Sequence, residues 1–159
     1  MEKEDQVPDF PDVSRKKHAL ECLIKAGLNL VQASQGSYLS ADFAGTALRF
    51  EVVAARDGMS GLLSVLSHRL LGKVMPFGRG VTGRAASEKR GQYASRFEVD
   101  DMAQIRGDGV PNAVLAVPVL KVGVVVGVMT AVCFDQEKAF NETSLANYAL
   151  LAEAAAEIV

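Results

Sequence analysis

The sequence contains no tryptophan, only two cysteines and only two histidines among its 159 residues. Cys22 and Cys133 lie far apart and form neither a CxxC pair nor the closely spaced set of a disulfide-stapled domain. Two such cysteines suit a reducing compartment, where each is expected to be a small apolar residue. The few histidines and cysteines also leave little material for a metal or haem site.

Long hydrophobic runs are missing as well. No segment reaches the roughly eighteen apolar residues that a membrane-spanning helix needs, and residues 1–11 are acidic and polar, unlike a secretory signal. The formal net charge of −2 and the pI near 5.7 provide no field that attracts nucleic acid or an anionic membrane. We therefore expect a cytoplasmic protein that binds neither nucleic acid nor membrane.

The residues that are present have the composition of a globular domain. Hydrophobic residues make up 49% and charged residues 23%, close to the average for folded domains, and the length suits one core. Residues 1–13, with Pro8 and Pro11 among acids, predict a flexible N-terminal arm. Residues 14–159 are expected to form a single domain that begins and ends in amphipathic helices.

Helices are indicated by apolar residues at helical spacing. The first helix is expected to begin near Ser14, its candidate N-cap, and to end near Gly36, with one apolar face made by Leu20, Leu23, Ile24, Leu28 and Val31. Similar patterns predict helices at residues 59–70 and 82–89. Asn141 is the expected N-cap of the last helix.

Strand patterns predict two hairpins and a short strand at residues 92–96. The first hairpin comprises residues 37–40 and 46–54, and the second joins two apolar runs, 113–120 and 124–132. Neither apolar run alternates with polar residues, so both faces of these strands should be covered, which makes the second hairpin central. Pro118 within it requires a bulge or a strand end. The order of elements predicts an α+β fold around one mostly antiparallel sheet.

Residues 73–96 are unusually basic, with a net charge of +5 that leaves −7 for the rest of the chain. Gly78, Gly80 and Gly83 permit a tight turn into a helix whose first N–H groups can meet an anion. Arginines would complete such an anion site. The alternative is a solvated surface on which these cations pair with the acids at 98–108.

The three glycines also match the spacing of the dinucleotide-binding fingerprint. That motif needs a buried strand before it and a full helix after it, whereas Pro76 precedes the glycines and Gly91 ends the helix. His18 and Cys22 are four residues apart and offer two metal ligands from one helix face, but two ligands do not make a site. We therefore expect no dinucleotide, metal or catalytic site.

Four stretches, in this order and spacing, resemble a GAF domain over residues 18–159: Tyr38-Leu39 with Gly45-Thr46-Ala47-Leu48-Arg49-Phe50, then Phe77-Gly78-Arg79-Gly80-Val81-Thr82-Gly83-Arg84-Ala85-Ala86, then Val114-Leu115-Ala116-Val117-Pro118-Val119, and Gly127-Val128-Met129 with the last helix. The resemblance implies an α+β fold with a mostly antiparallel sheet of about six strands and helices on both faces. It also implies a sensor domain that binds a small molecule and relays its state, through the terminal helices of a homodimer, to an effector domain or signalling partner.

The resemblance includes two alternatives: a ligand-free dimerisation module and a free methionine sulfoxide reductase. Such reductases use cysteines in the loops over the pocket, and residues 71–112 contain none, so we expect no enzyme. The cyclic-nucleotide signature is matched only at Phe97 and Asp101, and the pocket cysteine of bilin-binding members is missing. The ligand and any cofactor stay unidentified.

The ligand pocket is expected between residues 75–112 as roof and the second hairpin as floor, because the least regular segment lies beside the most buried one. Apolar walls are assigned to Phe77, Tyr93, Val117 and Met129, and polar contacts to Arg79, Ser95, Arg96 and Asn112. Arg96 is the chief candidate to bind a carboxylate or phosphate. Homodimerisation is expected through the stripe from Leu20 to Val31 and through Ile158 and Val159.

Overall fold

A computed structural model describes residues 10–56, 69–95, 113–134 and 139–159 of the chain. Within these ranges it has three helices and six strands: α1 (Phe10–Val31), β1 (Gln35–Ala41), β2 (Ala47–Ala55), β3 (Val74–Pro76), α3 (Gly80–Glu88), β4 (Gln92–Ser95), β5 (Ala113–Lys121), β6 (Val124–Cys133) and α4 (Glu142–Ile158). Of the helix predicted at residues 59–70, only residues 69 and 70 are described, and both are helical.

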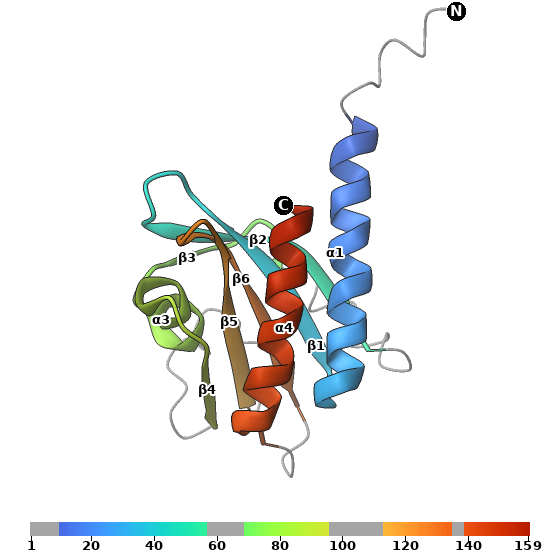
Figure 1. Ribbon diagram of the computed structural model, residues 1–159, viewed down its shortest axis with the longest axis vertical. Helices are drawn as coiled ribbons and strands as arrows, with labels where there is room; N and C mark the ends of the chain where they lie inside the picture. The colour runs from blue at the N-terminus through green and yellow to red at the C-terminus, as the bar shows by residue number, and fades with distance from the viewer. Residues whose placement is uncertain (1–9, 57–68, 96–112, 135–138) are drawn as a thin grey trace, which may run out of the picture.

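The six strands form one sheet in the order β3-β2-β1-β6-β5-β4, and every neighbouring pair is antiparallel. α1 and α4 lie side by side against one face of this sheet, and α3 packs on the other (Figure 1). The structure thus confirms the predicted α+β fold with a six-stranded antiparallel sheet and helices on both faces.

Two apolar clusters occupy the two faces of the sheet, which we call the α1–α4 face and the α3 face. In β5, Leu115, Val117 and Val119 belong to the cluster under α1 and α4, whereas Val114 and Ala116 belong to the cluster under α3. Successive residues of a strand point to opposite faces, so a strand covered on both sides is apolar throughout. This confirms that both faces of the second hairpin are covered.

Pro118 lies where β5 has a paired neighbour on only one side. It pairs with Val128 of β6, but β4 pairs with β5 only as far as Ala116, and the β5–β6 register shifts just after Val119. A missing backbone N–H is tolerated at such a partly open edge. Of the two predicted alternatives, the irregularity is present just after Val119, and β5 itself continues to Lys121.

The ends of α1 differ from the prediction. The helix begins at Phe10, so Ser14 is not its N-cap, and residues 10–13 are helical instead of part of the arm. It ends at Val31, after which Gln32 has a left-handed φ of 60°. Gly36 lies in β1, where a Cβ atom would approach Ile24 Cγ2 to 2.8 Å. This glycine permits close packing of α1 on the sheet and does not end the helix.

α4 is fixed at its start and at its middle. Asn141 caps it as predicted: its Oδ1 accepts the Ser144 backbone N–H at 2.9 Å, and the Ser144 hydroxyl oxygen accepts the Asn141 N–H. Tyr148 is completely buried, and its hydroxyl donates to the backbone oxygen of Thr130 at 2.7 Å. Burial raises the pKa of Tyr148 because the phenolate would lose its hydration.

α1 crosses α4 at Gly27, which faces Tyr148 and Leu151. A Cβ atom on Gly27 would lie 2.7 Å from Tyr148 Cε1, and that ring cannot retreat because its hydroxyl is bonded to the sheet. The absence of a side chain at Gly27 therefore sets how closely the two terminal helices pack.

Gly27→Ala should destabilise the protein even though alanine is the better helix former. The overlap with Tyr148 is expected to cost about 1–3 kcal/mol, against a gain in helix propensity of about 1 kcal/mol. Urea unfolding should therefore show a net loss of about 1 kcal/mol. Ala26→Gly at the adjacent exposed position measures the propensity difference alone. A Gly27→Ala protein more stable than the parent would contradict the close crossing.

Candidate functional site

Three buried polar side chains lie together on the α3 face of the two central strands. Ser37 of β1 pairs in register with Thr130 of β6, and Gln35 pairs with Val132. Val132 and Val128, on either side of Thr130, belong to the apolar cluster under α3, so Gln35, Ser37 and Thr130 point to that face. We call these three residues the polar cluster.

The polar cluster is only partly satisfied by its own hydrogen bonds. The Ser37 and Thr130 hydroxyls form a buried hydrogen bond of 2.5 Å. Gln35 is 4% exposed, and its Oε1 atom has no hydrogen-bond partner in the structure. A buried acceptor without a partner costs about 1–3 kcal/mol and is uncommon in folded proteins. Among the buried side-chain polar atoms of the described residues, Gln35 Oε1 is thus the acceptor that a hydrogen-bond donor from a ligand could satisfy.

α3 lies over the same face and is held there by the predicted glycine turn. Gly78 and Gly80 have φ values of 84° and 68°, and the Gly78 N–H donates to the Gly83 carbonyl at 2.8 Å. A Cβ atom on Gly83 would lie 2.6 Å from the Pro76 carbonyl oxygen, so only glycine fits. This turn brings Val81 and Ala85 onto the sheet.

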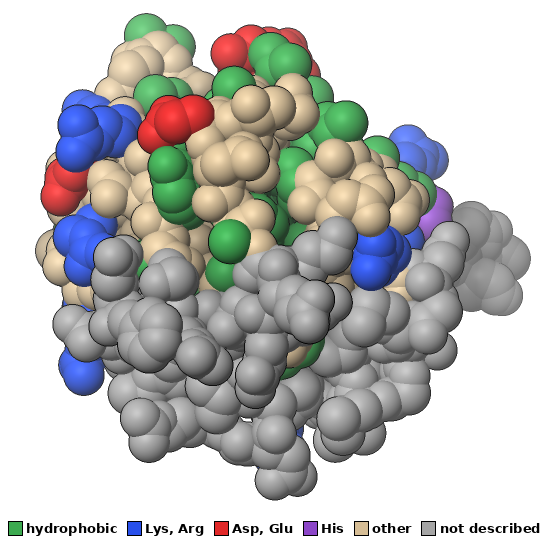
Figure 2. Space-filling model, turned by 90° about the horizontal axis from the view of Figure 1, so that it is seen from below, with side chains coloured by type: hydrophobic (Ala, Val, Ile, Leu, Met, Phe, Trp, Pro, Cys, Tyr) green, Lys and Arg blue, Asp and Glu red, His purple; other side chains and the backbone are tan. Residues whose placement is uncertain are grey.

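The basic residues around α3 lie mainly on the surface. Lys and Arg side chains gather along the left edge of the view in Figure 2, the side on which α3 lies in Figure 1. Lys89 Nζ donates to the Gly123 carbonyl at 3.0 Å, and Arg90 pairs with Glu88 at 3.3 Å. Exposed pairs of this kind contribute little to stability. These two cations lie on the surface, whereas Arg96 and the acids at 98–108 proposed as partners lie outside the described residues.

The predicted site residues that the structure describes lie on two different faces of the sheet. Val117 and Met129 are fully buried in the cluster under α1 and α4. Tyr93 pairs in register with Leu115 of that same face, and its hydroxyl donates to Glu142 of α4 at 3.1 Å. These three therefore lie on the α1–α4 face, opposite to α3.

The remaining predicted residues divide between the α3 face and undescribed segments. Phe77 packs on the α3-face cluster, and Arg79 is the exposed N-cap residue of α3. Ser95 is the last residue of β4. Arg96 and Asn112 lie outside the described residues. Val114, Ala116 and Val128 belong to the cluster on which Phe77 packs, whereas Val117 and Met129 face the other side of the sheet.

A groove on the opposite face lies between α4 and the segment that connects α3 to β4. Its two adjoining parts have volumes of about 420 and 400 Å³ and share Arg90, Gly91, Glu142 and Leu145. The groove carries charges of both signs, and Arg90 and Glu142 already have side-chain partners. It does not offer the free cations that an anionic ligand requires.

Sequence reasoning missed all three residues of the polar cluster. A signal was present for Thr130, which is the one hydroxyl residue within the apolar run 124–132. Gln35 was obscured because Gly36 was interpreted as the end of a helix, and Ser37 was predicted only as the first residue of a strand. No group of three or more His, Cys, Asp or Glu residues able to hold a metal occurs in the described part of the chain.

No family model and no curated protein matches the sequence. Among solved structures, the GAF domain of an Acinetobacter phosphoenolpyruvate-protein phosphotransferase superposes with a TM-score of 0.69 at 13% identity, covering 90% of this chain and 81% of that one. The second GAF domain of DevS from Mycobacterium smegmatis gives 0.68 at 17% identity, with coverages of 89% and 91%. This chain has the GAF fold.

The GAF fold is shared by proteins of different activity. Free methionine-R-sulfoxide reductase from Neisseria meningitidis, solved with its substrate, superposes with a TM-score of 0.67 at 16% identity, covering 90% of this chain and 77% of that one. Function must therefore be argued from this chain's own residues. No helix among the described residues is both long and apolar enough to cross a membrane.

Gln35→Met should stabilise the protein in the absence of any ligand. Methionine has a similar length and volume and removes the unpartnered Oε1, so the free energy of unfolding should rise by about 1 kcal/mol. Ser37→Ala is the matched comparison, because it leaves the Thr130 hydroxyl without its partner and should lower stability by a similar amount. Urea unfolding measures both; destabilisation by Gln35→Met would mean that the Gln35 amide is already satisfied.

Proposed function

We propose that this chain is a signal-input domain that binds a small molecule on the α3 face of its sheet. The observation that carries the proposal is the unpartnered oxygen of Gln35, buried beside the Ser37–Thr130 pair in the central strands. Binding sites are largely apolar surfaces with a few fixed polar groups, and the polar cluster within the apolar α3-face cluster has that composition.

The polar cluster favours the neutral part of a ligand. Gln35 Oε1 requires a hydrogen-bond donor, and neither Ser37 nor Thr130 carries a charge, so an amide, amine or hydroxyl group of the ligand suits this floor. An anionic group, if the ligand has one, is assigned to Arg96, as predicted from sequence. The ligand is thus proposed to be a polar small molecule with at least one donor.

The fold neighbours also include an enzyme, and the positions of the thiols bear on that alternative. Cys22 is exposed on α1, and Cys133 is buried in the cluster under α1 and α4. Neither Cys22 nor Cys133 therefore lies on the α3 face, where we propose that the ligand binds. We therefore propose ligand binding without thiol chemistry. Methionine sulfoxide reductase activity that is lost in a Cys22→Ser, Cys133→Ser double variant would contradict this.

Native mass spectrometry of the purified protein should reveal a retained small molecule, and variants then locate it. Arg96→Ala is expected to weaken binding by about 1.5–3 kcal/mol, the value of a hydrogen bond to a charged group. Gln35→Met should also weaken binding while it stabilises the free protein. Arg90→Ala, which removes a surface cation already paired with Glu88, serves as the control and should bind normally. Undiminished binding by Gln35→Met would reject the polar cluster as the site.

We further propose that the chain is a homodimer whose terminal helices relay the bound state to an effector domain or signalling partner. The apolar stripe from Leu20 to Val31 that motivated this expectation mostly packs within one chain. Its residues Leu20, Ile24 and Leu28 are buried in the core cluster between α1 and the sheet. Leu30 and Leu150 remain 53% and 62% exposed, and both lie within a turn of the crossing at Gly27. They provide the apolar contact for a second copy.

Leu30→Glu with Leu150→Glu should convert the dimer to a monomer without unfolding it, because both side chains are exposed. Light scattering at tens of micromolar in EDTA measures the mass, and circular dichroism checks the fold. Leu28→Glu is unsuitable as a test of the interface. Leu28 is fully buried, so this substitution would unfold the chain whether or not it dimerises. A parent protein that is monomeric, or a double variant that stays dimeric, would contradict the proposed interface.

A further inference from the structure

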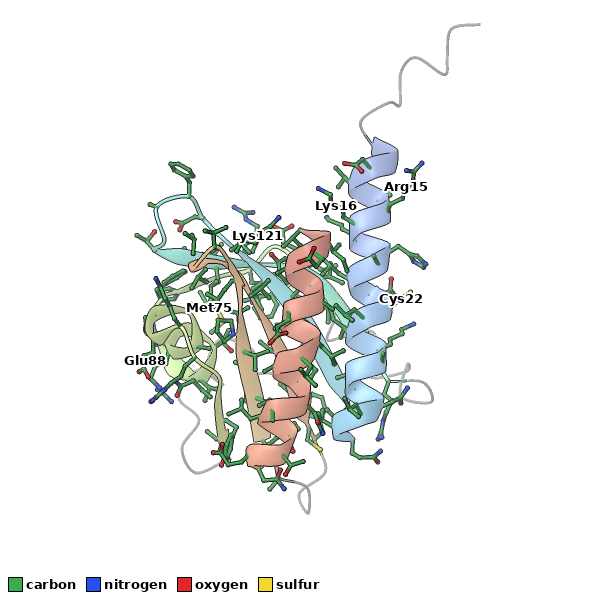
Figure 3. The ribbon with its side chains drawn as sticks, in the orientation of Figure 1. Arg15, Lys16, Cys22, Met75, Glu88 and Lys121 are labelled. Atoms are coloured by element: carbon green, nitrogen blue, oxygen red, sulfur yellow. The ribbon has the colours of Figure 1, made fainter. Side chains whose placement is uncertain are left out.

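His18 and Cys22 form an exposed pair on the outer side of α1. The Cys22 Sγ and His18 Nε2 atoms are 3.6 Å apart, and both residues are open to solvent. Cys22 projects from the side of α1 that points away from α4 (Figure 3). Their four-residue spacing makes them neighbours on one side of the helix, where the thiol and the imidazole form an exposed hydrogen bond outside the core.

This separation matches the bite of a tetrahedral zinc ion. Zinc binds thiolate sulfur at about 2.3 Å and histidine nitrogen at about 2.0–2.1 Å, which at a tetrahedral angle places the two ligand atoms about 3.5 Å apart. The helix therefore presents both donor atoms at a distance that one zinc ion can span. The adjacent carboxylate, Glu21, faces Lys25 at 3.7 Å and is not needed as a ligand.

One chain supplies only half of such a site. No third ligand accompanies the pair among the described residues, while a structural zinc ion has four protein ligands. Residues 12–18 are all exposed, and the first turns of α1 extend past the C-terminal end of α4 (Figure 1). A second copy can therefore bring its own pair to the same ion. We infer that His18 and Cys22 of two copies together bind one zinc ion in a Cys2His2 site.

Binding replaces the thiol protons of two Cys22 residues by the metal ion, and these protons pass to the buffer. Zinc stays in one oxidation state, so no oxidant or reductant takes part. The inference does not depend on the ligand proposed for the α3 face. It also differs from the dimer proposed through Leu30 and Leu150, because that interface persists in EDTA whereas the zinc site does not.

The test titrates Zn²⁺ chloride into reduced, metal-free full-length protein, with calorimetry for stoichiometry and Co²⁺ as the spectroscopic probe of tetrahedral thiolate coordination. We expect one Zn²⁺ per two chains and a Co²⁺ spectrum of a two-thiolate site that Zn²⁺ abolishes. Cys22→Ser and His18→Gln should each lower the affinity by about 100-fold or more, since loss of even an outer partner of a ligand costs 10–100-fold. Both positions are exposed, so the variants should fold normally.

Two controls separate this site from adventitious binding. Glu21→Gln removes the neighbouring carboxylate and should leave affinity and stoichiometry unchanged. Cys133→Ala removes the buried thiol and should keep the Co²⁺ spectrum. A stoichiometry of one Zn²⁺ per chain, a one-thiolate spectrum, or retention of binding by Cys22→Ser would each overturn the shared site.

Discussion

The arrangement of the whole domain depends on how one residue of β6, Thr130, is bonded on both sides of the sheet. Its backbone oxygen accepts the Tyr148 hydroxyl from α4, and its side chain bonds to Ser37 within the polar cluster. Tyr148 in turn presses against Gly27 of α1. The terminal helices and the candidate ligand site are thus joined through a single position at the centre of the sheet.

The sequence predicted most of the fold because the strongest patterns were local. Asn141 followed by an apolar periodicity identified the start of α4, and the two unbroken apolar runs identified strands covered on both faces. The short helix after the glycine turn was also found, since Gly78 and Gly80 indicate a backbone that other residues rarely adopt. These features depend on neighbours a few residues away, which a sequence displays directly.

The candidate site was less predictable because it depends on contacts between residues that are far apart in the sequence. A strand covered on both faces has few polar residues to mark which side is which, so the sequence did not show that Val117 and Met129 face α1 and α4 whereas their neighbours Ala116 and Val128 face α3. Gly36 was ambiguous too, because glycine both ends helices and permits close packing. Only the approach of Ile24, a contact between distant elements, decides between these roles.

The polar cluster connects the ligand site proposed on the α3 face with the helices on the other side of the sheet. A donor that pairs with Gln35 removes a local energetic penalty, and a ligand group that competes for the Ser37 or Thr130 hydroxyl changes the side chain of the residue whose carbonyl holds Tyr148. Contact alone does not establish coupling, which requires a ligand to favour one of two helix arrangements. The tight crossing at Gly27 provides a place where such arrangements differ sharply, because packed interfaces shift between discrete states more readily than they deform. A ligand that moves Tyr148 would act on Gly27, at the crossing of α1 and α4, the elements through which a second copy is proposed to bind.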